Sequence, residues 1–180
     1  MRMNASDEDL ALAAAGGDGA AFAALLERQY DRVFGLAFRL TGARAEAEDL
    51  TQDICAGLAA KLRGFDGRSR LTTWLYRVVV NAAHDRRRRQ AVRAKAAEGW
   101  GDWEVARRAT IAEGQDRAAW LLAALAELPE EIRDTLALTL DGVSQAEAAE
   151  VLGVAPGTIA WRVSEAKKRL AAMRAEEERV

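Results

Sequence analysis

Apolar residues recur every three or four positions along most of the chain, which is the spacing of a helix with one buried face. One such stripe lies between residues 18 and 41 and consists of Phe22, Leu25, Leu26, Val33, Leu36, Ala37 and Leu40. A second stripe predicts a helix over about 45–62 and consists of Leu50, Ile54, Leu58 and Leu62. The β-branched run Val78–Val80 falls inside a longer helical period that begins near Leu71. The pattern therefore predicts an all-α protein.

Capping residues indicate where several of these helices begin and end. The segments Ser6–Asp9 and Ser144–Glu147 each have the serine and acidic residue of a capping box. We expect Pro129 to occupy the first turn of a helix, where its missing N–H costs nothing. We expect Gly64 to be the C-terminal cap of the helix that precedes it.

The periodic pattern breaks over residues 95–114, where three glycines and charges of both signs show no helical period. Such a stretch is typical of the linker between two domains. We therefore expect two small helical domains, residues 1–95 and 116–175, joined by a flexible linker over 96–115.

The formal net charge of −2 conceals two blocks of opposite sign. Residues 44–53 carry four carboxylates against one arginine, whereas residues 61–95 carry eleven Lys and Arg residues against two Asp. Blocks of one sign indicate partners of the other sign. The chain thus has one candidate surface for a basic protein and another for a nucleic acid.

The sequence contains few of the residues from which catalytic or metal centres are usually formed. Cys55 is the only cysteine and His84 the only histidine, so no internal disulfide is possible and a histidine-based metal site lacks ligands. No nucleophile–base pair or phosphate-binding loop is visible. We expect no catalytic residue, no metal and no cofactor. The polar N-terminus and the lack of an apolar run of about 20 residues predict a cytoplasmic protein that does not insert into a membrane.

The segment 144–170 has the pattern of a helix-turn-helix: a short capped helix, a glycine turn and a second helix. The outward face of the second helix presents Gly157, Trp161, Ser164 and Lys168, flanked by Thr158 and Glu165. In a DNA-binding motif this face enters the major groove. A plain helical hairpin is the alternative for this segment taken alone.

The helix that begins near Leu71 places an aromatic ring, an amide and several cations on one face, namely Trp74, Arg77, Asn81, His84 and Arg88. An aromatic ring can stack on an unpaired base while cations contact phosphates, as in single-strand recognition. A solvated helix end is the alternative. The acidic helix before it turns Asp49, Gln52 and Asp53 outward, which indicates either a site for a basic protein or a solvated face.

The order of four segments resembles an extracytoplasmic-function sigma factor, a class of bacterial transcription initiation factor. The segments are AEDLTQD, SRLTTWLYRVVVNAAHDRRRR, LPEEIRDTL and SQAEAAEVLGVAPGTIAWRVSEAKKRL. TWLYRVVVNAAHD and its spacing to the later motif carry most of the resemblance, because a helix-turn-helix alone is a weak signal. Members of this family keep two conserved regions, region 2 and region 4, joined by a linker.

The resemblance implies partners and roles for particular residues. Region 2 would bind bacterial core RNA polymerase through Glu48, Asp49, Gln52 and Asp53. Region 2 would also hold the minus-ten strand of promoter DNA through Arg68, Arg70, Thr73, Trp74, Arg77, Asn81 and Arg88. Region 4 would bind the minus-thirty-five element through Gly157, Thr158, Trp161, Arg162, Ser164 and Lys168. The polymerase would supply the chemistry, and an anti-sigma factor would hold the protein inactive.

Trp161 departs from the family pattern, in which basic or small polar residues follow the Gly157–Thr158 pair. A tryptophan at this position suits either thymine methyl groups or a protein surface. Two other functions therefore stay open. One is a sigma-like module that titrates an anti-sigma factor without reading promoters. The other is a helix-turn-helix repressor, which would leave the acidic helix and the Trp74–Arg88 face unexplained.

Overall fold

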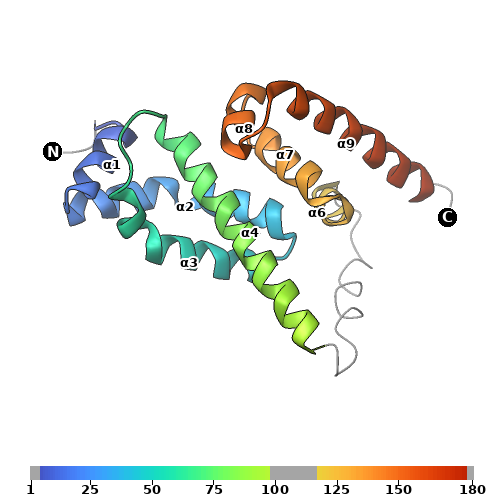
Figure 1. The fold of residues 1–180 in the computed structure, drawn as a ribbon, viewed down its shortest axis with the longest axis horizontal. Coiled ribbons are helices and arrows are strands. Elements are labelled where there is room, and N and C mark those ends of the chain that lie inside the picture. Colours follow the sequence, from blue (N-terminus) through green and yellow to red (C-terminus); the bar gives the residue numbers. More distant parts are fainter. Residues whose placement is uncertain (1–4, 98–116, 178–180) are drawn as a thin grey trace.

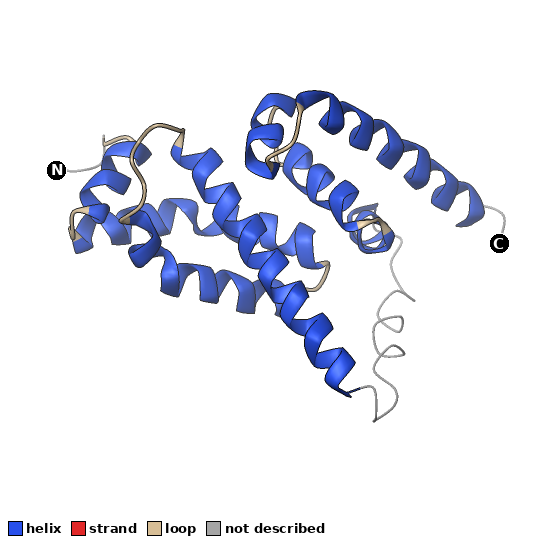
Figure 2. Cartoon of the chain, in the orientation of Figure 1, coloured by secondary structure: helices blue, strands red, loops and turns tan. Residues whose placement is uncertain are grey.

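The computed structural model describes residues 5–97 and 117–177, and within them every regular element is a helix (Figures 1 and 2). The first domain consists of α1 (Asp7–Ala15), α2 (Gly19–Thr41), α3 (Arg44–Leu62) and α4 (Leu71–Ala97). The second consists of α6 (Arg117–Glu127), α7 (Glu130–Leu140), α8 (Gln145–Leu152) and α9 (Pro156–Glu177). The all-α prediction is confirmed. The expected linker, 96–115, lies almost entirely outside the described residues.

Local capping explains several of the helix boundaries. The capping boxes Ser6–Asp9 and Ser144–Glu147 are both present, with the Ser6 Oγ accepting from the Asp9 N–H at 3.0 Å. The prediction that Gly64 caps α3 is wrong, because the helix ends at Leu62 with Arg63 as its cap in a right-handed conformation. The Gly64 N–H closes a tight turn onto the Lys61 carbonyl at 3.0 Å, so no left-handed residue is needed. Pro129 is the N-cap of α7 and not its first helical residue.

The first domain packs α1, α3 and α4 around the long helix α2. Its core is closely packed leucine, with Leu36 and Leu62 fully buried. The spacing of Leu75, Val78, Val79 and Ala82 predicts the buried stripe of α4, and this prediction is only partly right. Leu75 and Val79 are buried, but Val78 and Ala82 are half-buried, while Tyr76, Val80 and Ala83 are buried instead. The stripe is broader than expected because α4 also packs against α8 of the second domain.

The second domain contains the expected helix-turn-helix, formed by α8 and α9. Gly153 makes the turn with a φ of +64°, a conformation that glycine adopts without strain. Ala148 of α8 and Ile159 of α9 are both fully buried, and α7 packs behind them. This packing turns the other face of α9 outward.

The two domains lie in contact. In Figure 1, α4 crosses α2. Contacts between the domains join α4 to α8, and α2 to α6 and α7. One connected cluster of buried apolar residues includes Leu36 and Val79 of the first domain and Ala137, Leu138 and Ala148 of the second. None of the helices in the described segments is both long and apolar enough to cross a membrane.

Candidate functional site

The acidic helix α3 presents its predicted residues at the surface. The Asp49 and Asp53 side chains are 66% and 71% exposed, Gln52 is exposed, and Leu50 and Ile54 point inward. Arg86 of α4 lies beside both carboxylates, 3.2 Å from Asp49 and 3.8 Å from Asp53. Exposed ion pairs of this kind contribute little, so both carboxylates stay available to a basic partner.

Glu48 differs from these neighbours because its side chain is less exposed, at 44%, and pairs within its own helix. The Arg44 Nε donates to the Glu48 Oε1 at 2.8 Å. The four predicted residues of this surface therefore lie together, with Glu48 at its edge toward the start of α3.

The basic residues predicted for the minus-ten strand follow the loop before α4 and then α4 itself. Arg68 and Arg88 are highly exposed, and each pairs with an aspartate close in sequence, Asp66 and Asp85 respectively. Asn81 is also exposed. Arg68 in the loop, and Asn81 and Arg88 on α4, are therefore accessible to a partner.

Trp74 and Thr73, which the resemblance assigns to the minus-ten strand, are less accessible than Arg68 and Arg88. The Trp74 ring is half-buried and packs edge-to-face on Phe65, with the ring centroids 5.5 Å apart. Thr73 is only 4% exposed and lines a cleft with Asp141 and Glu147 of the second domain. The resemblance assigns Thr73 to the minus-ten strand, and in this structure the second domain covers the side of α4 on which Thr73 lies.

The outward face of α9 matches the expectation. Trp161 is 60% exposed, and Gly157, Ser164 and Lys168 are also exposed. Thr158 and Arg162 are half-buried at its edges. The exposure predicted for Trp161 is confirmed.

The negative charge that Glu165 adds near this face is paired. Its Oε1 accepts from the Arg169 Nε at 2.9 Å, and this bond lowers the pKa of the Glu165 carboxyl. Glu165 therefore stays ionised but has a cation beside it, which reduces the repulsion that it would exert on a phosphate backbone.

A row of charged contacts between the domains was not predicted from the sequence. Arg70 donates to Glu147 at 3.0 Å, and Arg77 donates to the Glu150 carbonyl at 3.1 Å. Arg39 of α2 donates to the Ala137 carbonyl at 3.1 Å and pairs with Asp141. Two of the arginines expected to contact DNA, Arg70 and Arg77, are thus engaged by α8.

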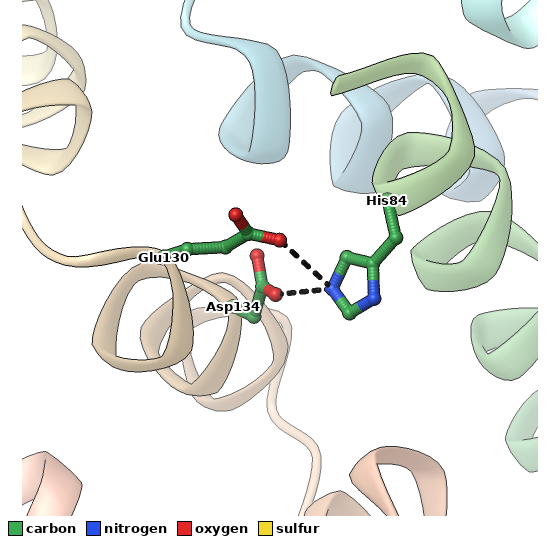
Figure 3. Close-up of side chains that lie close together, drawn as sticks. All are labelled: His84, Glu130 and Asp134. Atoms are coloured by element: carbon green, nitrogen blue, oxygen red, sulfur yellow. Dashed lines mark hydrogen bonds and ion pairs between the residues drawn. The ribbon is translucent and has the colours of Figure 1, made fainter. Parts of the chain in front are cut away.

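His84 of α4 contacts two carboxylates of α7 at once, Asp134 and Glu130, as Figure 3 shows. Its Nε2 lies 2.6 Å from the Asp134 Oδ2 and 3.6 Å from the Glu130 Oε1. The hydrogen bond to the buried Asp134 carboxylate raises the pKa of His84, although partial burial opposes this. The imidazole is therefore protonated more readily here than when it is free of Asp134.

The donor atoms of His84, Glu130 and Asp134 lie within 4.8 Å of one another, close enough to surround a cation. The Arg87 guanidinium, however, already contacts both carboxylates, at 2.9 Å from Glu130 and 3.2 Å from Asp134. This positive charge balances them, so we assign no metal to the cluster.

A second buried contact joins Tyr76 to Asp141, whose carboxylate also pairs with Arg39. Burial and the hydrogen bond to Asp141 raise the pKa of the Tyr76 hydroxyl far above its ordinary value. The hydroxyl is therefore a permanent donor that ties α4 to the C-terminal end of α7.

The family follows from comparison with known proteins. Residues 25–93 match the model of Sigma-70 region 2, and residues 118–170 match that of Sigma-70 region 4. The chain is 36% identical over 173 residues to the ECF RNA polymerase sigma factor SigM of Mycobacterium tuberculosis, covering 94% of this chain and 85% of SigM. The chain belongs to the ECF RNA polymerase sigma factors. Sigma factors are transcription initiation factors.

Two solved structures of similar chains were found in complexes. The sigma factor RpoE from Bartonella quintana, bound to the anti-sigma factor NepR, is similar with a TM-score of 0.72 and 26% identity, covering 86% of this chain and 96% of RpoE. CnrH, bound to the cytosolic domain of CnrY, is similar with a TM-score of 0.68 and 27% identity, covering 94% of this chain and 97% of CnrH. The first and second domains are called region 2 and region 4 below.

Proposed function

We propose that this protein binds core RNA polymerase in the cytoplasm and directs it to a specific set of promoters, with no catalytic role of its own. The observation that carries the proposal is the set of three exposed surfaces that one short chain presents in the family's order. They are an acidic helix, a basic and aromatic helix, and an outward helix-turn-helix face.

The three surfaces have separate tasks in this proposal. Asp49, Gln52 and Asp53 bind the polymerase, because exposed carboxylates suit a basic protein surface and accelerate its association. The minus-ten strand is held by Arg68, Arg70, Arg77, Asn81 and Arg88. The Trp74 ring stacks on a base of this strand. The face of α9 around Trp161 and Lys168 binds the minus-thirty-five element in the major groove.

We also propose that an anti-sigma factor controls this activity. Support comes from the similar chain of RpoE, which was solved in complex with the anti-sigma factor NepR. The alternative function, a module that only titrates an anti-sigma factor, draws its support from the exposed Trp161. It predicts that the chain binds such a protein but supports no transcription.

Reconstituted transcription separates these functions. Core polymerase is supplied with fragmented genomic DNA, with and without the chain, and the 5′ ends of the transcripts are mapped. We expect a small set of start sites that appear only with the chain and share two upstream sequence elements. No new start site, in a preparation that binds core polymerase, would contradict promoter direction and favour the titration module.

A further inference from the structure

Region 4 covers part of the cationic surface of region 2 through charges of opposite sign. We call the cations of α2, of α4 and of the loop just before α4 the basic face of region 2, and the carboxylates of α7, its C-cap and α8 the acidic face of region 4. The basic face comprises Arg39, Arg70, Arg77, His84 and Arg87. The acidic face comprises Glu130, Asp134, Asp141, Glu147 and Glu150.

The basic face overlaps the surface proposed for the minus-ten strand. Glu147 accepts from Arg70 at 3.0 Å, and Glu150 accepts from Arg77 through both its carbonyl and its carboxylate. A phosphate group would bind the same guanidinium donors. The carboxylates also repel the phosphates of an approaching strand, so the covered face disfavours DNA even at neighbouring positions.

The contact is not limited to flexible side chains at the rim. The buried apolar cluster runs without interruption from Val79 and Val80 of α4 to Ala148 and Val151 of α8. Asp134, which bonds both His84 and Arg87, is 2% exposed. The opposite charges and the shared apolar cluster both indicate that the acidic face of region 4 binds region 2 of the same chain.

We propose that this contact is an autoinhibited closed state, in which the acidic face of region 4 occupies cations that region 2 needs for the minus-ten strand. Opening, when core polymerase binds, releases them. The proposal rests on the proposed function, because it assigns Arg70 and Arg77, which the acidic face pairs, to promoter DNA.

The strength of the outer contacts suits a state that opens readily. The Arg70 side chain is 75% exposed, and in the second outer pair Arg77 is 41% and Glu150 52% exposed. Ion pairs exposed to this extent are individually weak and are screened by salt. Removing two of them should therefore favour the open state without unfolding either region.

Closure can be measured in the full chain by energy transfer between two dyes. Ala23→Cys on α2 and Ala172→Cys on α9 provide exposed attachment sites, and Cys55→Ser removes the native thiol. The opening variant combines Glu147→Gln with Glu150→Gln, since glutamine keeps the capping box of α8. The matched control combines Glu127→Gln with Glu131→Gln, which removes two exposed charges from region 4 outside the acidic face.

We expect the free wild-type chain to show high energy transfer, which falls when core polymerase is added. The opening variant should shift the ratio of closed to open molecules toward open by about threefold or more, as two exposed ion pairs imply. The control should resemble the wild type. Equal transfer in the opening variant and the wild type would overturn the proposed role of the acidic face.

A second measurement tests whether closure masks the DNA site. The probe is a fluorescent single strand spanning the minus-ten element of a promoter mapped by reconstituted transcription. We expect the opening variant to bind it more tightly than the wild type by the same factor, with no gain in the control. If the opening variant shows reduced energy transfer but binds the strand no more tightly than the wild type, the proposal that closure masks the DNA site is wrong. Loss of transcription in every variant would contradict the proposed function instead, because energy transfer in the free chain involves neither polymerase nor DNA.

Discussion

The His84 Nε2 lies 2.6 Å from the Asp134 Oδ2, which joins α4 of region 2 to α7 of region 4 across 50 residues of sequence. His84 is the only histidine of the chain. Its environment consists of two carboxylates, Asp134 and Glu130 on α7, and one cation, Arg87 on its own helix. The contact between the regions therefore contains a histidine whose pKa the contact itself raises.

We expect acid to strengthen the closed state through His84. The bond to Asp134 raises the pKa of His84 above its ordinary value of 6.5 in the closed state, whereas the open state lacks this bond. The stabilisation is fully present below pH 6.5 and is lost as the pH rises through the raised pKa. Energy transfer between dyes on α2 and α9, measured from pH 5.5 to 8.5, should fall with rising pH.

His84→Gln is the control for this titration, because glutamine still donates to Asp134 but does not ionise. Its energy transfer should be constant over the same range. A wild-type profile that does not depend on pH, or one that survives in His84→Gln, would contradict the role of His84.

The acidic surface of α3 should bind the polymerase. Asp49→Arg combined with Asp53→Arg places cations where a basic partner meets carboxylates, and like charges at an interface cost several kcal/mol. We expect the affinity for core polymerase to fall at least tenfold, or about 1.4 kcal/mol. Glu27→Arg combined with Asp31→Arg, at two exposed positions on α2, is the control for the change in net charge. Unchanged affinity in the double variant, measured by titration with labelled chain, would mean that the α3 surface is merely solvated.

Asn81 should act on strand opening and not on duplex binding. It is exposed on α4, so Asn81→Ala should leave the free energy of unfolding within about 0.5 kcal/mol of the wild type. We expect the permanganate reactivity of the minus-ten thymines to fall severalfold in polymerase complexes. Normal reactivity in a folded variant would remove Asn81 from the minus-ten site.

Trp74 needs two variants because it packs on Phe65 as well as facing the proposed strand. Trp74→Ala should lower both the melting temperature and strand opening, since stacking of a base on an aromatic ring contributes about 1–3 kcal/mol. Trp74→Phe keeps a ring in place and should recover most of the opening. If the loss of strand opening in each variant is fully accounted for by its lower melting temperature, the Trp74 ring stabilises the fold and does not contact the DNA.

Trp161 and Lys168 should affect the minus-thirty-five element in different ways. Loss of the apolar contact in Trp161→Ala should weaken binding and change base preference by about 1–3 kcal/mol at the contacted positions. Lys168→Ala should weaken all sequences alike and reduce the salt dependence, because phosphate contacts carry no sequence information. If Trp161 instead serves an anti-sigma factor, promoter binding by Trp161→Ala should be normal while that complex weakens. A variant normal in both assays would contradict both roles.

The helices and their caps could be predicted from the sequence because their causes are local. The box of Ser144 and Glu147 and the glycine turn at Gly153 lie within one or two turns of the helices that they delimit. The family resemblance then placed each surface on its helix. The prediction for Gly64 failed because two ways of ending a helix compete at short range, and α3 uses the one that needs no glycine.

The contact between the regions could not be predicted because nothing local encodes it. Asp134 and Arg77 look like ordinary surface charges in their own helices, and a charge does not specify a partner that lies 47 to 73 residues away in the sequence. The burial of Thr73 and Tyr76 has the same origin, since both line the cleft beside Asp141. The contact becomes visible only in the structure, where the carboxylates of α7 and α8 lie next to the cations of the basic face.

Run-off transcription tests the central claim most directly. The template carries the region upstream of the protein's own gene, and core polymerase is supplied alone, with the wild-type chain, or with the chain carrying Asp49→Arg and Asp53→Arg. We predict a transcript of defined length with the wild-type chain, none with core polymerase alone, and little with the double variant. A wild-type chain that binds core polymerase yet yields no specific transcript, on this template or on genomic fragments, would contradict the account.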